Sequence, residues 1–218
     1  MKFYVGLHMP SHAAQFERCM ISVARLRDRK SDFEVGEWMM DSGAFTEIKT
    51  HGRYRDSVEQ YAAHAERWSR CGQCVAVVSQ DYMCEPFILA KTGLTTQEHQ
   101  RLTIERYDAL SALVRSAYVL PVLQGYLPDE YVAHAREYGE RLAHGQWVGV
   151  GSVCKRNVDV EEIEAVLMAI RREAARLEAA RLRRQADGAG IVRGKGLSLL
   201  GGFDGVELLG SQAGKGWQ

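Results

Sequence analysis

Short apolar runs alternate with longer segments of helical periodicity along most of the 218 residues, and this alternation restricts the fold more than any other feature. The runs predict strands at residues 3–7, 38–40, 75–78, 118–123 and 147–150. The intervening segments predict helices at 12–26, 56–68, 95–114 and 159–184, and a further helix that begins at Pro128. This order predicts an α/β fold with a parallel sheet and helical crossovers.

Polar or glycine residues follow each predicted strand: His8, Asp41–Gly43, Gln80–Asp81, Gln124–Gly125 and Gly151–Ser152. In a barrel of alternating strands and helices, the active site lies at the carboxyl ends of the strands. The fold class predicted is therefore α/β, a (β/α) TIM-type barrel. The spacing averages about 36 residues per unit, so eight units would need about 290 residues. We therefore expect a barrel that is incomplete or irregular at its C-terminal end.

The composition is that of an ordinary globular chain, 46% apolar and 26% charged. No apolar run approaches the roughly 18 residues of a membrane span, and the N-terminus does not resemble a signal peptide. Five scattered cysteines do not form a secreted disulfide framework. We expect a cytoplasmic protein without membrane contact. Lys plus Arg equals Asp plus Glu, 28 each, so any binding of nucleic acid must come from local patches.

Two carboxylates at strand ends are the sharpest chemical signal. Asp41 is placed for acid/base work or for binding the N–H groups of a heterocycle, although it could also cap a turn. Asp81 is a second carboxylate at the same predicted edge, and it too could be a cap. Gln124 can donate and accept hydrogen bonds beside Gly125, which permits a close backbone approach. Gly151 offers a backbone N–H.

Other polar residues carry weaker signals. His64, His99 and His134 lie on predicted helices and are expected to be surface or packed residues. The cations Arg25 and Arg27 are expected at the far side of the barrel, at the end of the first helix. A second group follows the strands and could hold phosphates or simply be solvated: Lys49, Arg53, Arg55, Lys91, Lys155 and Arg156. The pair Cys71 and Cys74 has CxxC spacing but no second pair, which is weak for zinc.

Taken together, four segments resemble the tRNA-guanine transglycosylase family. That family has Asp-Ser-Gly-Gly-Phe where this chain has Asp41–Phe45, and Val-Gln-Gly-Gly where it has Leu123–Tyr126. Asp81 is followed by Cys84-Glu85-Pro86, as in the family, and Gly149–Ser152 takes the place of Gly-Gly-Leu-Ser. Order and spacing match over about residues 38–155. When the opening segment Phe3–His8 is included, the sequence of these motifs most resembles that of the smaller relatives that put 7-deazaguanines into DNA.

The resemblance implies a pentosyltransferase that replaces guanine with a queuine-type 7-deazaguanine base. It implies that Asp41 is the acid/base, that Asp81 and Gln124 read the polar edge of the base, and that Gly151 donates to its carbonyl. Tyr82 or Tyr126 would stack on the ring. The remaining residues expected at the substrate are Ser42, Gly43, Phe45, Gly125 and, from its position after the first strand, His8. The family's nucleophile is a later aspartate that forms a covalent glycosyl-enzyme, for which Asp204 is the candidate.

The expected partners are the 7-deazaguanine base and DNA, with RNA less favoured. The target nucleotide would be flipped out or single-stranded. Lys155, Arg156 and Arg53 are predicted to contact phosphates. The family's Cys-x-Cys-x-x-Cys and His zinc pattern does not occur here, so we expect no metal and no cofactor. Related enzymes are often dimers, so a dimer is an open expectation.

Three alternatives remain open at this point. The enzyme could act on RNA, as the tRNA-modifying relatives do. It could be another small barrel, a lyase or hydrolase with Asp41 as base. It could also be a truncated, inactive relative that binds a base or nucleic acid without exchanging it.

The predicted division of the chain is a transglycosylase-like barrel region at 1–184 and an atypical tail at 185–218. The tail holds 34 residues, ten of them glycine, and lacks periodicity. We hypothesise that it is a frame-shifted reading. Codons permitted for Leu197–Glu207, read one nucleotide later, encode Tyr-Leu-Ser-Ser-Ala-Asp-Ser-Met-Ala-Trp. This peptide resembles the strand and aspartate expected for the nucleophile.

Overall fold

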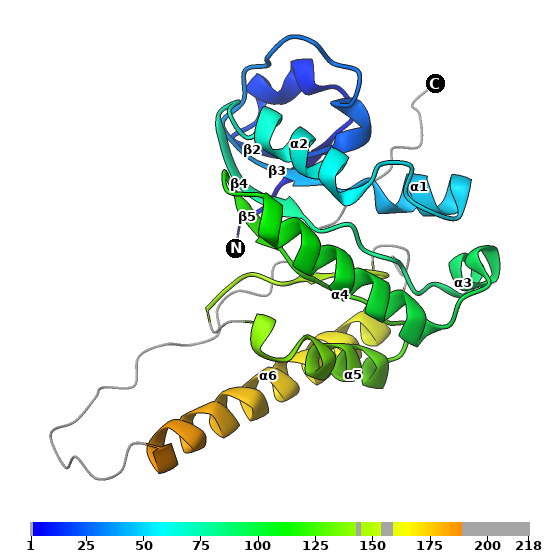
Figure 1. The fold of residues 1–218 in the computed structure, drawn as a ribbon, viewed down its shortest axis with the longest axis vertical. Coiled ribbons are helices and arrows are strands. Elements are labelled where there is room, and N and C mark those ends of the chain that lie inside the picture. Colours follow the sequence, from blue (N-terminus) through cyan, green and yellow to red (C-terminus); the bar gives the residue numbers. More distant parts are fainter. Residues whose placement is uncertain (1, 143–144, 154–158, 189–218) are drawn as a thin grey trace, which may run out of the picture.

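The computed structural model describes residues 2–142, 145–153 and 159–188. Five parallel strands form a sheet in chain order. They are β1 (Val5–Leu7), β2 (Arg18–Ser22), β3 (Glu37–Asp41), β4 (Gln73–Val78) and β5 (Tyr118–Leu120). All neighbouring pairs are parallel, so the carboxyl ends of the strands lie at one edge (Figure 1).

A second parallel pair continues this order. β6 (Val122–Leu123) pairs with β7 (Gly149–Val150), and only Pro121 separates β6 from β5. Proline has no N–H to donate, so the ladder changes partner at this residue. β5 pairs with β4, whereas the Pro121 carbonyl accepts from Gly149 N at 2.8 Å and β6 pairs with β7. The strand at 118–123 therefore links β4 to β7.

The helix predicted at 12–26 is wrong. This segment contains the 3-10 helix η1 (Pro10–Gln15), strand β2 and the 3-10 helix η2 (Val23–Arg25). Phe16, Met20 and Val23 have helical spacing, which misled the prediction. β2 pairs with strands on both sides, and its consecutive residues Cys19–Ile21 are all buried. A strand buried on both faces lacks the alternation of apolar and polar residues by which a strand is recognised in a sequence.

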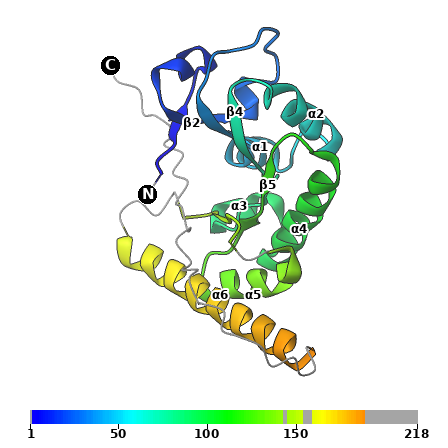
Figure 2. The same cartoon turned by 90° about the vertical axis from the view of Figure 1, so that its left-hand side faces the viewer.

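The four remaining predicted helices are present: α2 (Val58–Trp68), α4 (Thr96–Leu113), α5 (Pro128–Tyr138) and α6 (Val160–Gly188). Thr95 and Glu98 form the predicted capping box of α4, and Pro128 lies in the first turn of α5. The Asp159 carboxylate accepts from Glu162 N at 2.9 Å, as its predicted cap requires. Figure 2 shows α6 alongside α5, which it contacts.

Three short helices were not predicted: α1 (Ala44–His51), α3 (Pro86–Thr92) and the 3-10 helix η3 (Gly139–Arg141). The first two directly follow the polar segments after β3 and β4. Each ends at a glycine with positive φ, Gly52 at 70° and Gly93 at 71°. They are too short for periodicity to identify them.

The two faces of the sheet support separate apolar clusters, because successive side chains of a strand point to opposite faces. Trp38 and Met40 pack with Tyr61 and Trp68 of α2 in one cluster. Met39, between them, belongs to a second cluster with residues of the neighbouring strands. A third cluster joins β6 and β7 to α5 and α6. This packing fixes the strand ends relative to one another.

The α/β class and the parallel sheet are confirmed, whereas the described residues do not form a closed barrel. Helix α6 continues to Gly188, four residues past the predicted boundary at 184. Residues 189–218, on which the frame-shift hypothesis rests, lie outside the described part of the chain. Within that part, no helix combines the length and apolar character that a membrane span requires.

Candidate functional site

Adjacent parallel strands bring the predicted polar residues to one edge of the sheet. Asp41 is the last residue of β3, Asp81 lies three residues after β4, and Gln124 directly follows β6. Asp81 and Gln124 are hydrogen-bonded to each other. Ser42 Oγ donates to Asp81 Oδ1 at 3.1 Å. The structure therefore brings these four side chains, predicted from separate motifs, into one neighbourhood.

Asp81 is held from three directions. Its Oδ1 and Oδ2 accept from Ser42 and from Gln124 Nε2, and its backbone carbonyl accepts from the Tyr54 hydroxyl at 2.8 Å. Burial, with a further contribution from the charge of Asp41, raises the pKa of the Asp81 carboxyl to about 7, against the opposing effect of the hydrogen bonds. The group can therefore gain or lose a proton near neutral pH.

Asp41 has a more open position than Asp81: it is half-buried. Its Oδ2 accepts from the N–H of Gly43 at 3.0 Å, which is the Asx-type turn considered as the alternative interpretation. Burial raises the pKa of Asp41, although hydrogen bonds from Gly43, Ser22 and Ser42 oppose this. Gly43 has a φ of 73° and forms the N-cap of α1, a conformation that glycine adopts at little cost. A partly accessible carboxyl of raised pKa can transfer a proton.

The Gln124 amide occupies the space that a side chain at position 151 would fill, so this position requires glycine. A Cβ there would lie 2.1 Å from Gln124 Nε2. Gln124 Oε1 accepts from Ser152 Oγ at 2.8 Å, so the amide bridges Ser152 to Asp81. Ser152 has a φ of 57°, which is strained for a residue with a side chain. Its hydroxyl also lies 3.0 Å from Glu85 Oε2 and accepts from Cys84 N at 3.0 Å.

The backbone of Gln124 is fixed by two helices. Its N–H donates to His134 Nδ1 at 2.8 Å, and its carbonyl accepts from Gln100 Nε2 at 2.7 Å. His134 therefore carries its hydrogen on Nε2, which lies 3.1 Å from the Gln100 carbonyl. Burial lowers the pKa of His134 to about 4, so the ring is neutral at pH 7. His134 and Gln100 thus act as positioning residues for Gln124.

Helix α4 presents a row of polar side chains to the loops of the site. His99 Nδ1 lies 2.6 Å from Met83 O, and Thr103 Oγ1 accepts from Tyr82 N at 2.9 Å. One turn further, Arg106 donates to Gln80 Oε1 at 2.6 Å. Sequence reasoning missed this row. Its only signal was polar residues at helical spacing on a side of α4 that packs inward: His99, Gln100, Thr103 and Arg106.

Other predicted substrate residues are placed less directly. Tyr82 is buried, with its ring edge-on to Tyr54 at 5.6 Å and to His99 at 5.4 Å. Phe45 and Tyr126 are half-buried, and Gly125 is buried against Tyr131. In this structure the N–H of Gly151 already donates to the Leu123 carbonyl, at 2.9 Å.

The remaining predicted residues lie at the margin of the site or outside the residues that the structure describes. His8 is exposed after the edge strand β1, with Nδ1 at 2.8 Å from Arg25 Nη2. Arg53 is exposed on the segment between α1 and α2. Asp204, Lys155 and Arg156 lie outside the described residues, so their predicted roles as nucleophile and phosphate contacts stay predictions.

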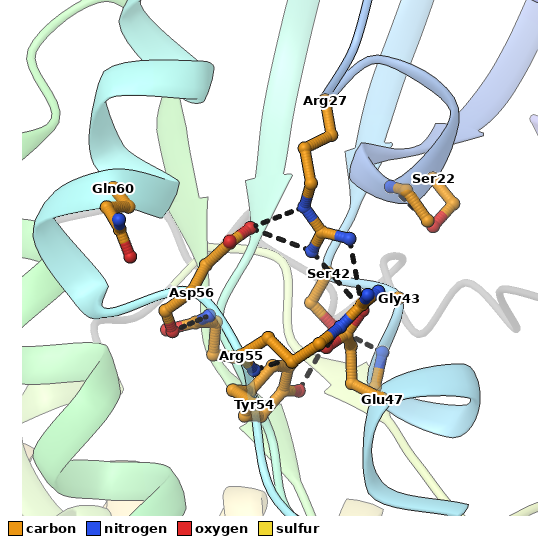
Figure 3. A network of polar contacts seen from close by, with 12 residues as sticks. Ser22, Arg27, Ser42, Gly43, Glu47, Tyr54, Arg55, Asp56 and Gln60 are labelled. Atoms are coloured by element: carbon orange, nitrogen blue, oxygen red, sulfur yellow. Dashed lines mark hydrogen bonds and ion pairs between the residues drawn. The ribbon is translucent and has the colours of Figure 1, made fainter. Parts of the chain in front are cut away.

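An ion-pair network lies beside the site (Figure 3). The Glu47 carboxylate is buried and accepts from Arg55 and Arg27, and Arg27 also pairs with Asp56 at 2.8 Å. The two guanidinium groups hold the pKa of Glu47 at about 2. The expectation that Arg27 lies at the far side of the barrel is wrong. Because β2 replaces the first helix, Arg27 follows the carboxyl end of a strand.

Residues 54–56 therefore form a strap that joins this network to the site. Tyr54 bonds the Asp81 carbonyl, Arg55 bonds Glu47, and Asp56 bonds Arg27. Figure 3 shows these residues around Ser42 and Gly43. The strap therefore contacts both the turn after β3, through Ser42, and the turn after β4, through the Asp81 carbonyl.

The cysteines show no metal-binding arrangement within the described residues. Cys71 is buried and Cys74 is half-buried. Burial raises the pKa of the Cys74 thiol to about 12. In the described part of the chain, His, Cys, Asp and Glu do not gather in a group of three or more that could hold a metal ion.

Comparison with known proteins identifies one family. The family model described as DpdA, DeoxyPurine in DNA protein A, matches residues 1–183. This match confirms the resemblance to the DNA-modifying relatives of tRNA-guanine transglycosylase. No curated protein matches the sequence.

Proposed function

The chain belongs to the DpdA family, the 7-deazaguanine DNA transglycosylases, and on that premise we propose that it exchanges guanine in DNA for a 7-deazaguanine base. The site at the carboxyl ends of β3, β4, β6 and β7 would carry the reaction. The proposal includes an incomplete (β/α) TIM-type barrel and DNA as the substrate.

The observation that carries the proposal is the arrangement around Asp81. A guanine-type base presents several N–H donors and a carbonyl along one edge. Asp81 supplies a carboxylate that accepts from such donors, and the Gln124 amide beside it can donate or accept. Ser42, Tyr54 and the α4 residues hold these groups in place before any base enters. Preformed polar groups of this kind favour recognition of one base edge.

Asp41 is the proposed acid/base. The nucleophilic carboxylate forms a bond to C1′ of the deoxyribose while the bond from C1′ to N9 of guanine breaks. Guanine takes a proton from Asp41 as it leaves. The incoming base then attacks C1′, releases the carboxylate and gives its own N9 proton to Asp41. Burial raises the pKa of Asp41, and this supports the role, because a carboxyl that holds its proton more readily than an ordinary aspartate can both give and take a proton.

The nucleophile would be a later aspartate, with Asp204 as the candidate. Tyr82 or Tyr126 would stack on the base, and Gly43, Phe45, Gly125, Gly151 and His8 would line its surroundings. Arg53, Lys155 and Arg156 would contact phosphates. The target nucleotide would leave the duplex to reach Asp81, which is buried. A dimer and a cytoplasmic location stay predictions.

Release of guanine from DNA that depends on an added 7-deazaguanine tests the function. Duplex and single-stranded DNA with labelled guanine are incubated with the protein, with and without the base. We expect release only when both protein and base are present. Release of guanine without the base would indicate a hydrolase. Release from RNA alone would favour the RNA-acting alternative. Binding of DNA with neither release of guanine nor formation of a trapped covalent adduct would favour an inactive binding relative.

A further inference from the structure

Helices α1 and α3 begin directly after the two carboxylate segments and contact each other at the same end of the sheet. Figure 1 shows both helices on the same side of the molecule, beyond the strands. α1 starts three residues after Asp41, and α3 starts five residues after Asp81. Their outer surface therefore flanks the site that the proposed function assigns to the base.

An exposed aromatic residue lies on this surface. Phe87 of α3 is 48% exposed, and its ring meets that of Phe45 of α1 edge-on, with centroids 6.4 Å apart. The Lys49 ammonium lies over the Phe45 ring, 5.1 Å from its centroid. A single exposed apolar side chain is common on protein surfaces. Here, however, it continues an aromatic pair from the site to solvent, with a cation at its side.

The exposed charged side chains of α1, of α3 and of the segment directly after α1 are positive. Lys49 and Lys91 are exposed on α1 and α3, and Arg53 is exposed directly after α1. Glu47 is the one acidic residue in the two helices, and it is buried in ion pairs with Arg27 and Arg55. An aromatic ring among exposed cations complements a polyanion that carries flat bases. Single-stranded DNA is bound by this combination of ring stacking and basic groups.

We propose that Phe87 stacks on the base of a nucleotide that flanks the flipped target, while Lys49 and Lys91 contact the adjacent phosphates. This inference rests on the proposed function, because it places DNA at the site. Phe87 supports the strand beside the target after the target base has left the stack. It would not contact the reacting atoms.

The direct test replaces Phe87 with Trp and follows its fluorescence during titration with a single-stranded oligonucleotide that contains guanine. We expect quenching when a base stacks on the indole. The control is Leu113→Trp, because Leu113 is 43% exposed at the C-terminal end of α4, at the opposite end of the sheet. Equal quenching of the two variants, or none in Phe87→Trp, would overturn the proposal.

Affinity measurements separate stacking from general apolar contact. We expect Phe87→Tyr to bind DNA as the wild type does, and Phe87→Leu to bind roughly 5- to 100-fold more weakly, since leucine has no aromatic face. Because Phe87 is half exposed, neither variant should lose its fold, which circular dichroism checks. Lys49→Ala and Lys91→Ala should each flatten the salt dependence of binding to the single-stranded oligonucleotide by a slope of about 0.7. Wild-type affinity in Phe87→Leu would contradict stacking.

These outcomes are distinct from failure of the proposed function. If the wild type exchanges bases while Phe87→Leu binds DNA normally, the function stands and the stacking surface is wrong. If the wild type exchanges no base while Phe87→Leu weakens DNA binding, the surface stands and the exchange reaction is wrong. If the wild type does not bind DNA at all, both are wrong.

Discussion

Gln124 Nε2 donates a hydrogen bond to Oδ2 of Asp81, across 43 positions of sequence and between the segments that follow β6 and β4. The bond leaves neither group free to turn away from the site, because Ser42 holds the other oxygen of Asp81 and Ser152 holds the Gln124 carbonyl oxygen. The site is thus a chain of side chains that ordered strands and short loops assemble before substrate binds.

The first prediction concerns the pH dependence of stability at Asp81. Its pKa rises from an ordinary 3.8 to about 7 on folding, so folding favours the protonated carboxyl. The resulting stability is fully present below about pH 4 and is lost as the pH rises through about 7. Asp81→Asn removes this titration. We expect its unfolding free energy in urea to fall less than that of the wild type between about pH 5 and pH 8.

Asp28→Asn is the matched control, because Asp28 is exposed. Its pH profile should follow the wild type. In the exchange assay, Asp81→Asn should raise KM for the deazaguanine roughly tenfold, since an amide cannot replace a carboxylate that accepts two N–H bonds. A pH profile unchanged from the wild type would mean that Asp81 does not titrate as its burial requires.

The second prediction concerns His134 as the acceptor for the N–H of Gln124. In His134→Leu this buried N–H loses its partner, which should lower the unfolding free energy by about 1–3 kcal/mol at pH 7. The pKa of His134 falls from an ordinary 6.5 to about 4 on folding, so its neutral form contributes stability that is lost as the pH falls from 6.5 to 4. The destabilisation should therefore shrink at about pH 5.

The helical His64, which is half-buried, provides the comparison through His64→Leu. Urea unfolding at both pH values measures the two effects. If His134→Leu is no more destabilising than His64→Leu, or if its effect does not depend on pH, the neutral ring does not hold Gln124.

The third prediction uses the missing side chain at Gly151. Gly151→Ala would place a Cβ 2.1 Å from Gln124 Nε2, so the amide could fit only by giving up its hydrogen bonds to Asp81 and Ser152. We expect a fold close to that of the wild type but at least about tenfold weaker base exchange, because Gln124 leaves Asp81. Gly149→Ala, two residues earlier in the same segment, meets its nearest atom at 3.3 Å and should lose less activity. Equal losses in both variants would indicate a general effect on β7.

The strand ends could be predicted from the sequence because a polar residue after an apolar run is visible locally. Asp41, Asp81 and Gln124 were identified in this way, and the parallel sheet follows from the alternation of strands and helices. Strand β2 could not be found, because Cys19, Met20 and Ile21 are buried between two partners that the sequence does not show.

The supporting residues were hidden for another reason. Tyr54, Gln100 and His134 act through bonds to the backbone of distant residues, and such bonds leave no pattern in the sequence. Arg27 was misplaced because its position depends on β2. The backbone partners in these bonds become visible only when the sheet has assembled the loops.

Incorporation of a labelled 7-deazaguanine into DNA by the wild type, by Asp41→Asn and by the control Asp28→Asn tests the proposed exchange directly. Asp41 is the proposed acid/base, and asparagine keeps its size but transfers no proton. We expect incorporation by the wild type and by Asp28→Asn, and a loss of about 100-fold or more in Asp41→Asn with DNA binding retained. Full incorporation by Asp41→Asn would contradict the proposed role of Asp41.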